Sequence, residues 1–252
     1  MEIVTVTPEN LAQEHICCAI SSDNDCQAAC KKAWLAARFA DGLVFKKGNV
    51  RGKCFIEYIP AEQAWAPIDA SGYTYIDCLW VSGQWKGQGH SSLLLSECIR
   101  DSQAQGKKGL CLLSSQKKKL PFLADPKYLA YKGFAVADTA DPYFALMYLP
   151  FDTSATPPRF QACAKRPQVD ASGFALYYAD QCPYTAKYVP LLQTVAAARG
   201  VTLETIHLQS AVQAQSAPTP FTSFSLFYGG RFVTHEILSE QKFSKIIDEY
   251  AK

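Results

Sequence analysis

One stretch of the chain, residues 73–98, limits the possible folds more than any other feature. It reads YTYIDCLWVSGQWKGQGHSSLLLSEC. Its opening part, YTYIDCLWV, is rich in aromatic and β-branched side chains, which favour a half-buried strand. A glycine-bearing turn follows, and Leu93, Leu94 and Cys98 then recur at helical spacing before Gly106. The sequence therefore predicts a strand that passes through a glycine turn into a helix.

The start of the predicted helix is a candidate anion site. The first turn of a helix leaves backbone N–H groups without partners, and the helix dipole adds partial positive charge there. Gly87 and Gly89 have no Cβ, so a phosphate can approach their amides closely. The stretch lacks the third glycine of a dinucleotide fingerprint and the Lys-Ser/Thr ending of a nucleotide-triphosphate loop.

The spacing resembles the acyl-CoA loop of the GCN5-related N-acetyltransferases (GNAT), whose pattern is Gln/Arg-x-x-Gly-x-Gly/Ala followed by a helix with a Leu-Leu pair. Here Gln84 opens that pattern and Leu93-Leu94 follow it. The resemblance implies acetyl-CoA as cosubstrate, with its pantetheine arm paired to the backbone of Leu79, Trp80 and Val81. It also implies that the pyrophosphate lies on Gln84, Trp85, Lys86, Gly87, Gln88, Gly89 and His90.

Composition and charge set the broad class. A chain of 252 residues with 48% hydrophobic residues can fill two domain cores, and a net charge of +2 gives no general attraction to nucleic acid or anionic lipid. No apolar run has the length of a membrane span, and the N-terminus has no secretory signal, so we expect a cytoplasmic protein. The ten cysteines then suit a reducing compartment as mostly buried side chains. They lie at positions 17, 18, 26, 30, 54, 78, 98, 111, 163 and 182.

The first 150 residues predict a mixed sheet with flanking helices. A helix start is expected at Thr7-Pro8, a helix over residues 25–39, and strands over 43–47 and 53–59. The apolar run at 109–115 predicts a strand parallel to the one at residue 73. A further helix is expected over 121–132, and closing strands at 135–136 and 143–149. The GNAT resemblance implies that the two parallel strands splay apart to admit the thioester.

The remainder predicts a connector and a second domain. Residues 151–169 contain three prolines and no clear period, which is typical of a linker. Residues 170–252 predict the order strand, helix, strand, hairpin and helix, which resembles thioredoxin and glutaredoxin. Cys182-Pro183-Tyr184-Thr185 stands where glutaredoxins carry Cys-Pro-Tyr-Cys. The whole chain resembles bacterial proteins that join a GNAT domain to a YoaP-type domain.

Acyl transfer to an amine requires a base for the amine and an acid for the leaving thiolate. Glu57 and Asp77, on neighbouring predicted strands, are the base candidates, although either could instead form an ordinary ion pair. Tyr131 and Tyr128 are the acid candidates. Cys182 precedes a helix, which favours its thiolate, whereas burial would disfavour it; we expect a partly reactive thiol.

The favoured function is an acetyl-CoA-dependent N-acetyltransferase that acts by direct attack on a small-molecule or peptide amine. The alternatives are a thiol-redox or thiol-binding protein that uses Cys182, with the first domain as a CoA sensor, and a binding module without turnover. No metal site is expected, because no His/Cys cluster has ligand spacing.

Overall fold

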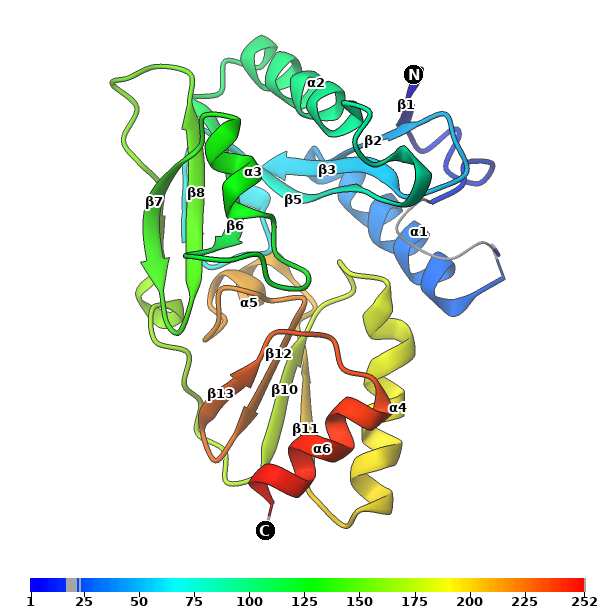
Figure 1. The fold of residues 1–252 in the computed structure, drawn as a ribbon, viewed down its shortest axis with the longest axis vertical. Coiled ribbons are helices and arrows are strands. Elements are labelled where there is room, and N and C mark those ends of the chain that lie inside the picture. The colour runs from blue at the N-terminus through cyan, green and yellow to red at the C-terminus, as the bar shows by residue number, and fades with distance from the viewer. Residues whose placement is uncertain (17–21, 23, 252) are drawn as a thin grey trace.

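The computed structural model describes residues 1–16, 22 and 24–251, so Cys17 and Cys18 lie outside the described residues. Figure 1 shows two units, with the larger sheet above and the smaller sheet below. The N-terminal sheet has seven strands in the order β1-β2-β3-β5-β6-β8-β7. Its pairs are antiparallel except for the parallel pair β5–β6. The predicted mixed sheet with flanking helices is therefore confirmed.

The N-terminal elements follow the predicted order closely. The strands are β1 (Ile3–Val6), β2 (Val44–Gly48), β3 (Cys54–Pro60), β4 (Ile68–Asp69), β5 (Tyr73–Val81), β6 (Gly109–Ser115), β7 (Ala135–Ala140) and β8 (Phe144–Pro150). The helices are α1 (Cys26–Arg38), α2 (His90–Ala104) and α3 (Pro126–Tyr131). Short 3₁₀ turns occur at η1 (Phe39–Asp41), η2 (Ala61–Gln63) and η3 (Gly83–Trp85).

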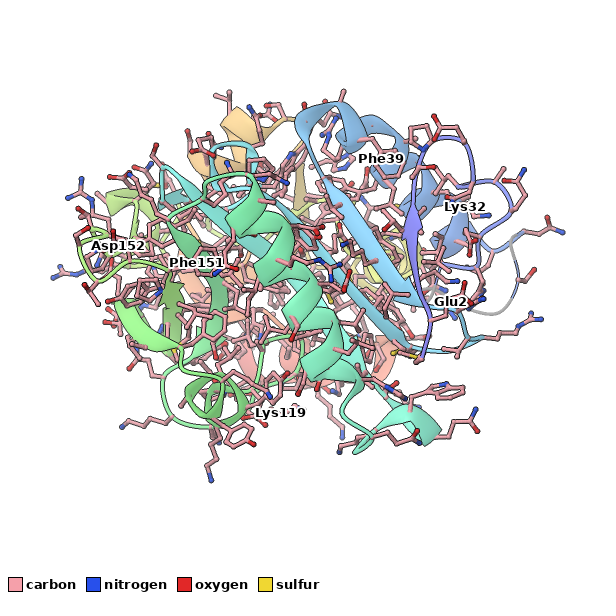
Figure 2. All side chains as sticks on the ribbon, turned by 90° about the horizontal axis from the view of Figure 1, so that it is seen from above. Glu2, Lys32, Phe39, Lys119, Phe151 and Asp152 are labelled. Carbon is pink, nitrogen blue, oxygen red and sulfur yellow. The ribbon has the colours of Figure 1, made fainter. Side chains whose placement is uncertain are left out.

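Alternation along β3 gives the N-terminal sheet two different faces. Phe55 and Ile59 pack in a cluster with Leu35 of α1, whereas Ile56 and Tyr58 pack in another with residues of α2. This is the period of two expected of a strand covered on both faces. Figure 2 views the molecule from above and shows α2 lying across the near face of the sheet.

The C-terminal sheet has four strands in the order β11-β10-β12-β13, with β10–β11 parallel and the other pairs antiparallel. Residues of α4 and α6 share one apolar cluster with β10 and β12. The strands are β10 (Phe174–Tyr178), β11 (Leu203–His207), β12 (Phe224–Tyr228) and β13 (Arg231–Thr234). The helices are α4 (Tyr184–Ala198), α5 (Ala211–Gln215) and α6 (Glu240–Tyr250).

The two units are packed on each other through a continuous core. Ala179, Leu208, Ala214 and Ala217 of the C-terminal unit belong to the same buried cluster as the α1 face of the larger sheet. The connecting segment is also docked, because β9 (Arg159–Phe160) pairs with β4, and a short turn, η4 (Ala162–Ala164), follows it. The C-terminal unit is thus held against the side of the sheet that α1 covers.

Two predicted elements differ from the structure. The segment after Thr7 forms successive turns without a helix, because Asn10 Oδ1 accepts from the Thr7 amide and its side chain also donates to Thr5. The helix expected from residue 121 begins only at Pro126, where Asp125 caps it by accepting from the Lys127 amide. The residues before that cap form a loop in which Phe122 has a left-handed φ of 62°.

Candidate active site

The two parallel strands of the larger sheet separate partway along their length. Pairing between β5 and β6 is confined to residues 73–75 and 109–111. β5 runs on to Val81 and β6 to Ser115, so beyond Tyr75 the β6-facing edge of β5 has no strand partner in the described part of the chain. Leu79, Trp80 and Val81 lie on this open edge, which can accept an extended molecule as an added strand.

The glycine turn leads directly from this edge into α2. Gly87 and Gly89 have φ values of 81° and 79°, and Gly89 is the N-cap of α2. Within the described residues the backbone amides of Gly87, Gly89 and His90 make no hydrogen bond. A Cβ at Gly87 or Gly89 would meet no atom within 4 Å. The residues predicted to hold the pyrophosphate therefore surround open space at a helix N-terminus, and they fit a phosphate group.

A bulge on β5 brings the two predicted base candidates together. Glu57 of β3 pairs with Cys78, and Tyr58 pairs with Ile76, which leaves Asp77 as the extra residue. Glu57 faces the α1 side, since Phe55 and Ile59, two residues away in each direction, pack there. Asp77 lies two residues beyond the last β5–β6 pair, at the mouth of the splay.

Glu57 is engaged through both of its carboxylate oxygens. Lys31 Nζ lies 2.5 Å from Oε2, and the Trp34 indole donates to Oε1 over 3.0 Å. Glu57 and Lys31 are 1% and 2% exposed, so this is a buried ion pair between β3 and α1. Removing one member of such a pair is costly because the other charge stays buried.

Asp77 is bound on one side by the C-terminal unit. The Gln181 side-chain amide donates to Asp77 Oδ1 over 2.8 Å. Burial raises the pKa of Asp77 well above its ordinary value, and the nearby charge of Glu57 raises it further, while Lys31 acts in the opposite direction. A carboxylate whose pKa is raised toward neutral pH is suited to accept a proton from an ammonium group.

The two candidate tyrosines have different environments. Tyr131 is 81% exposed, and Lys132 lies 5.0 Å from its ring centre. Tyr128 packs against the same buried cluster as Leu79 and Val81 of β5, and its buried hydroxyl has no hydrogen-bond partner among the described residues. A buried hydroxyl is normally hydrogen-bonded, so the unpaired Tyr128 oxygen is consistent with a group that acts on a bound molecule.

Cys182 lies beside the ion pair, where burial and the helix terminus act in opposite directions on the pKa of its thiol. Burial raises the pKa of the Cys182 thiol to about 11, against the lowering by the Tyr184 backbone amide and by Lys31. The helix-terminal effect is therefore the weaker one, and the thiolate is disfavoured at neutral pH. The buried Thr185 hydroxyl donates to the carbonyl of Cys182.

Sequence reasoning did not find Lys31, which pairs with Glu57, or Gln181, which donates to Asp77. We call these four residues the carboxylate cluster. Lys31 Nζ also donates to the Gln181 carbonyl over 2.8 Å. Neither residue belongs to a motif, and the contact joins positions 150 residues apart, so no local pattern could reveal it.

Across the residues that the structure places, no group of three or more His, Cys, Asp or Glu side chains is arranged to hold a metal ion. Nor does any helix in that part of the chain have the length and apolar character to cross a bilayer.

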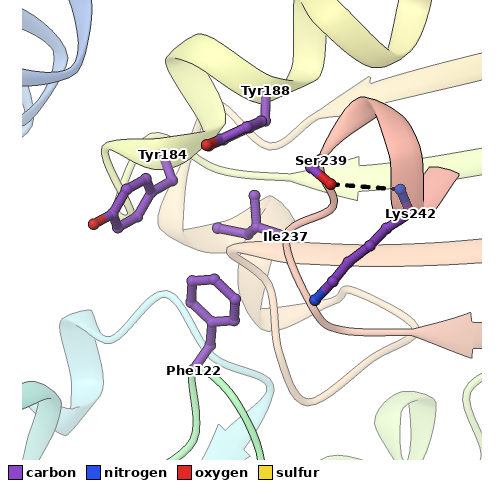
Figure 3. A pocket seen from close by; sticks show the side chains of 6 residues that line it. All are labelled: Phe122, Tyr184, Tyr188, Ile237, Ser239 and Lys242. Atoms are coloured by element: carbon purple, nitrogen blue, oxygen red, sulfur yellow. Dashed lines mark hydrogen bonds between the residues drawn. The ribbon is translucent and has the colours of Figure 1, made fainter. Parts of the chain in front are cut away.

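A cavity of about 160 Å³ lies where the loop before α3 meets the C-terminal unit. Figure 3 shows Phe122 from the N-terminal unit facing the C-terminal residues. The cavity is lined by Phe122, Tyr184, Tyr188, Ile237, Ser239 and Lys242. Tyr184 also connects it to the open strand edge, because its hydroxyl accepts from Lys53 Nζ, which lies 4.4 Å from the Trp80 ring centre.

Comparison with known proteins shows similarity over the full length of the chain. The uncharacterized N-acetyltransferase YoaP of Bacillus subtilis (strain 168) is 42% identical over 249 residues, which cover 98% of this chain and 99% of that protein. The YoaP-like family matches residues 203–245.

Two solved structures also show similarity at low identity. The GNAT family N-acetyltransferase YhbS of Escherichia coli, in complex with CoA, is 13% identical with a TM-score of 0.41 and covers 64% of this chain and 89% of its own. YncA of Salmonella typhimurium, with acetyl-CoA, is 16% identical with a TM-score of 0.43 and covers 62% and 96%.

Proposed function

The chain belongs to the YoaP family of N-acetyltransferases, and on that premise we propose that it transfers an acetyl group from acetyl-CoA to an amine by direct attack. The observation that carries the proposal is the open edge of β5 beside the amides of Gly87, Gly89 and His90, none of which has a partner among the described residues. An extended arm with an anionic end matches this arrangement of strand edge and helix N-terminus. The arm of CoA, with its pyrophosphate, is such a molecule.

In the proposed reaction Asp77 is the base. Its Oδ2 atom accepts a proton from the acceptor ammonium, directly or through one water molecule, and the neutral amine then attacks the thioester carbonyl. Backbone amides on the open edge of β5 supply donors for the oxyanion that forms. Glu57, the other base candidate, contributes through its charge, which raises the pKa of Asp77.

Tyr128 is the proposed proton donor to the leaving thiolate. Its buried hydroxyl has no partner among the described residues, whereas the Tyr131 side chain points into solvent. Of the two acid candidates, Tyr128 is therefore better supported than Tyr131.

The domain assignment is part of the same proposal. Residues 1–150 form the GNAT-type acyltransferase domain, 151–169 the connector and 170–252 a thioredoxin-like domain. The strand order β11-β10-β12-β13, with its parallel first pair and antiparallel hairpin, supports the last assignment. We also propose a cytoplasmic location, which is consistent with the burial of Cys54, Cys98 and Cys111 as small apolar side chains.

The test begins with ligand binding to the full chain. Acetyl-CoA should raise the melting temperature, because a ligand that binds the native state stabilises it. Release of free CoA thiol is then measured with propylamine, phenethylamine, putrescine and a lysine amide as acceptors. No stabilisation by acetyl-CoA and no amine-dependent thiol release would overturn the proposal.

The assignment of Asp77 is tested with Asp77→Asn, which should lower kcat/KM by roughly 10²-fold or more, as expected for loss of a general base. Asp69→Asn is the matched control, because Asp69 pairs with Arg159 at an exposed site outside the cluster. An Asp77→Asn variant that folds and keeps wild-type turnover would show that another group is the base.

A further inference from the structure

The Gln181 side chain enters the carboxylate cluster from the C-terminal unit and is held at several points. Its Nε2 donates to Asp77 Oδ1 over 2.8 Å, and its backbone carbonyl accepts from Lys31 Nζ over 2.8 Å. The Ser223 hydroxyl donates to its Oε1 atom at 3.4 Å. Because the acceptor end of the amide faces Ser223, the donor end is directed at Asp77.

This contact leaves one particular oxygen of the cluster available. Both Glu57 oxygens are engaged, by Lys31 and by Trp34. Asp77 Oδ1 is engaged by Gln181, while Asp77 Oδ2 makes no hydrogen bond to any described residue. Gln181 therefore fixes the rotation of the carboxylate and determines which oxygen can meet an acceptor.

We propose that Gln181 is a positioning residue for Asp77, so that the C-terminal unit completes the acyl-transfer site of the N-terminal unit. This inference rests on the proposed function, in which Asp77 is the base. It gives the C-terminal unit a role in acetyl transfer that requires no redox chemistry at Cys182. It also explains why the segment before α4 lies against the bulge on β5 and the ion pair from α1.

The role predicts a definite direction of change in pH dependence. An N–H donor to a carboxylate stabilises its charged form, so loss of the Gln181 amide should raise the pKa of Asp77. A hydrogen bond to a charged group contributes about 1.5–3 kcal/mol, which corresponds to about one to two pH units. The other groups that face Asp77 are Glu57, Lys31, Tyr75 and Cys111, and they remain unchanged in the variant.

The test compares Gln181→Met with Gln193→Met in the full chain. Methionine keeps the length of the side chain and removes the donor. Gln193 is the matched control because its Nε2 makes a similar bond to Thr205 Oγ1 on the surface of the same unit. A second variant, Gln181→Glu, keeps the size and adds a negative charge, which should raise the pKa of Asp77 further.

The first measurement needs no acceptor. Proteins with ¹³C-labelled aspartate are titrated by NMR, with the Asp77 signal assigned by its loss in Asp77→Asn. We expect a higher Asp77 pKa in both Gln181 variants and an unchanged value in Gln193→Met. The same Asp77 pKa in Gln181→Met and in the wild type would overturn the inference.

The second measurement is the pH profile of kcat/KM with acetyl-CoA and propylamine, or with whichever amine of the panel is turned over fastest. The acid limb should move to higher pH by about one to two units in Gln181→Met, with activity recovering on the alkaline side. If kcat/KM falls by the same factor at every pH, or if it rises, Gln181 is not a positioning residue for Asp77. If Asp77→Asn does not lower kcat/KM, the assignment of Asp77 as the base is wrong. That result differs from those that overturn the role of Gln181, so the two failures are distinguishable.

Discussion

At the scale of single residues, Glu57 and Asp77 show how two carboxylates acquire different roles from their surroundings. Both Glu57 oxygens are bound, by Lys31 and by Trp34, whereas Asp77 has a raised pKa and one oxygen without a partner among the described residues. Replacing Glu57 with Gln removes the charge that raises the pKa of Asp77, so the acid limb of kcat/KM should move to lower pH. Stability should fall by roughly 3–5 kcal/mol, because Lys31 loses its buried partner.

The control for this variant is Glu97→Gln, which breaks the contact of Glu97 with Lys46 on the α2 face. It should lower the melting temperature less, because that pair is more exposed, and it should leave the acid limb in place. If Glu57→Gln abolishes turnover at all pH values while it remains folded, the base is Glu57 and not Asp77.

The two tyrosines of α3 provide a second test at this scale. Tyr128→Phe should lower kcat by roughly 10²-fold as a lost general acid, with little loss of stability, because the hydroxyl it removes has no partner in the described structure. Tyr131→Phe should change neither quantity, since that side chain is 81% exposed. The measurement is kcat and melting temperature for both variants. Equal turnover in Tyr128→Phe and the wild type would remove Tyr128 from the mechanism.

At the scale of elements, helix α2 has left-handed glycines at both ends, and only one end faces the proposed cosubstrate site. Gly89 before the helix and Gly106 after it have φ values of 79° and 67°, and a Cβ at either would meet nothing within 4 Å. Alanine should therefore strain the backbone at both positions to a similar extent. Gly89→Ala should also weaken acetyl-CoA binding by roughly tenfold, because the added Cβ would occupy space that the proposed pyrophosphate needs beside the amides.

Calorimetry with acetyl-CoA on both variants separates these effects. Gly106→Ala should bind like the wild type despite a similar loss of stability. Similar affinity in the two variants would mean that the amides before α2 do not hold the pyrophosphate.

The same elements show how far the sequence could specify the structure. The strand over residues 53–59, the glycine turn before α2 and the helix over residues 25–39 follow from local patterns, and β3 and α1 lie within a residue or two of these bounds. The bulge at Asp77 depends on register between two strands, which no local pattern records. Gln181 could not be predicted as part of the site, because it reaches Asp77 only after two separately encoded units have packed together.

At the scale of the whole molecule, His235 joins the two units in a way that makes their packing sensitive to pH. Its ring hydrogen-bonds with Tyr143 through Nδ1 at 2.7 Å and with the Pro121 carbonyl through Nε2 at 2.8 Å. Since the carbonyl can only accept, Nε2 carries the hydrogen, and in the neutral ring Nδ1 accepts from the Tyr143 hydroxyl. Burial lowers the pKa of His235, so the folded protein favours this neutral form.

The sign of the resulting pH dependence follows from linkage. Because the folded-state pKa of His235 is lower than its unfolded value of about 6.5, its contribution is fully present above that value. It is lost as the pH falls below about 6.5, since the unfolded chain then binds the proton more readily.

His235→Phe should lower the melting temperature at pH 7.5 by about 2–4 °C, for a loss of roughly 1 kcal/mol. The further decrease between pH 7.5 and 5.5 should be smaller in the variant than in the wild type. His207→Phe is the control, because His207 stacks on Tyr178 within the C-terminal unit and touches neither Tyr143 nor Pro121. A wild-type slope retained in His235→Phe would show that acid weakens the protein through other groups and that this contact does not couple the units to pH.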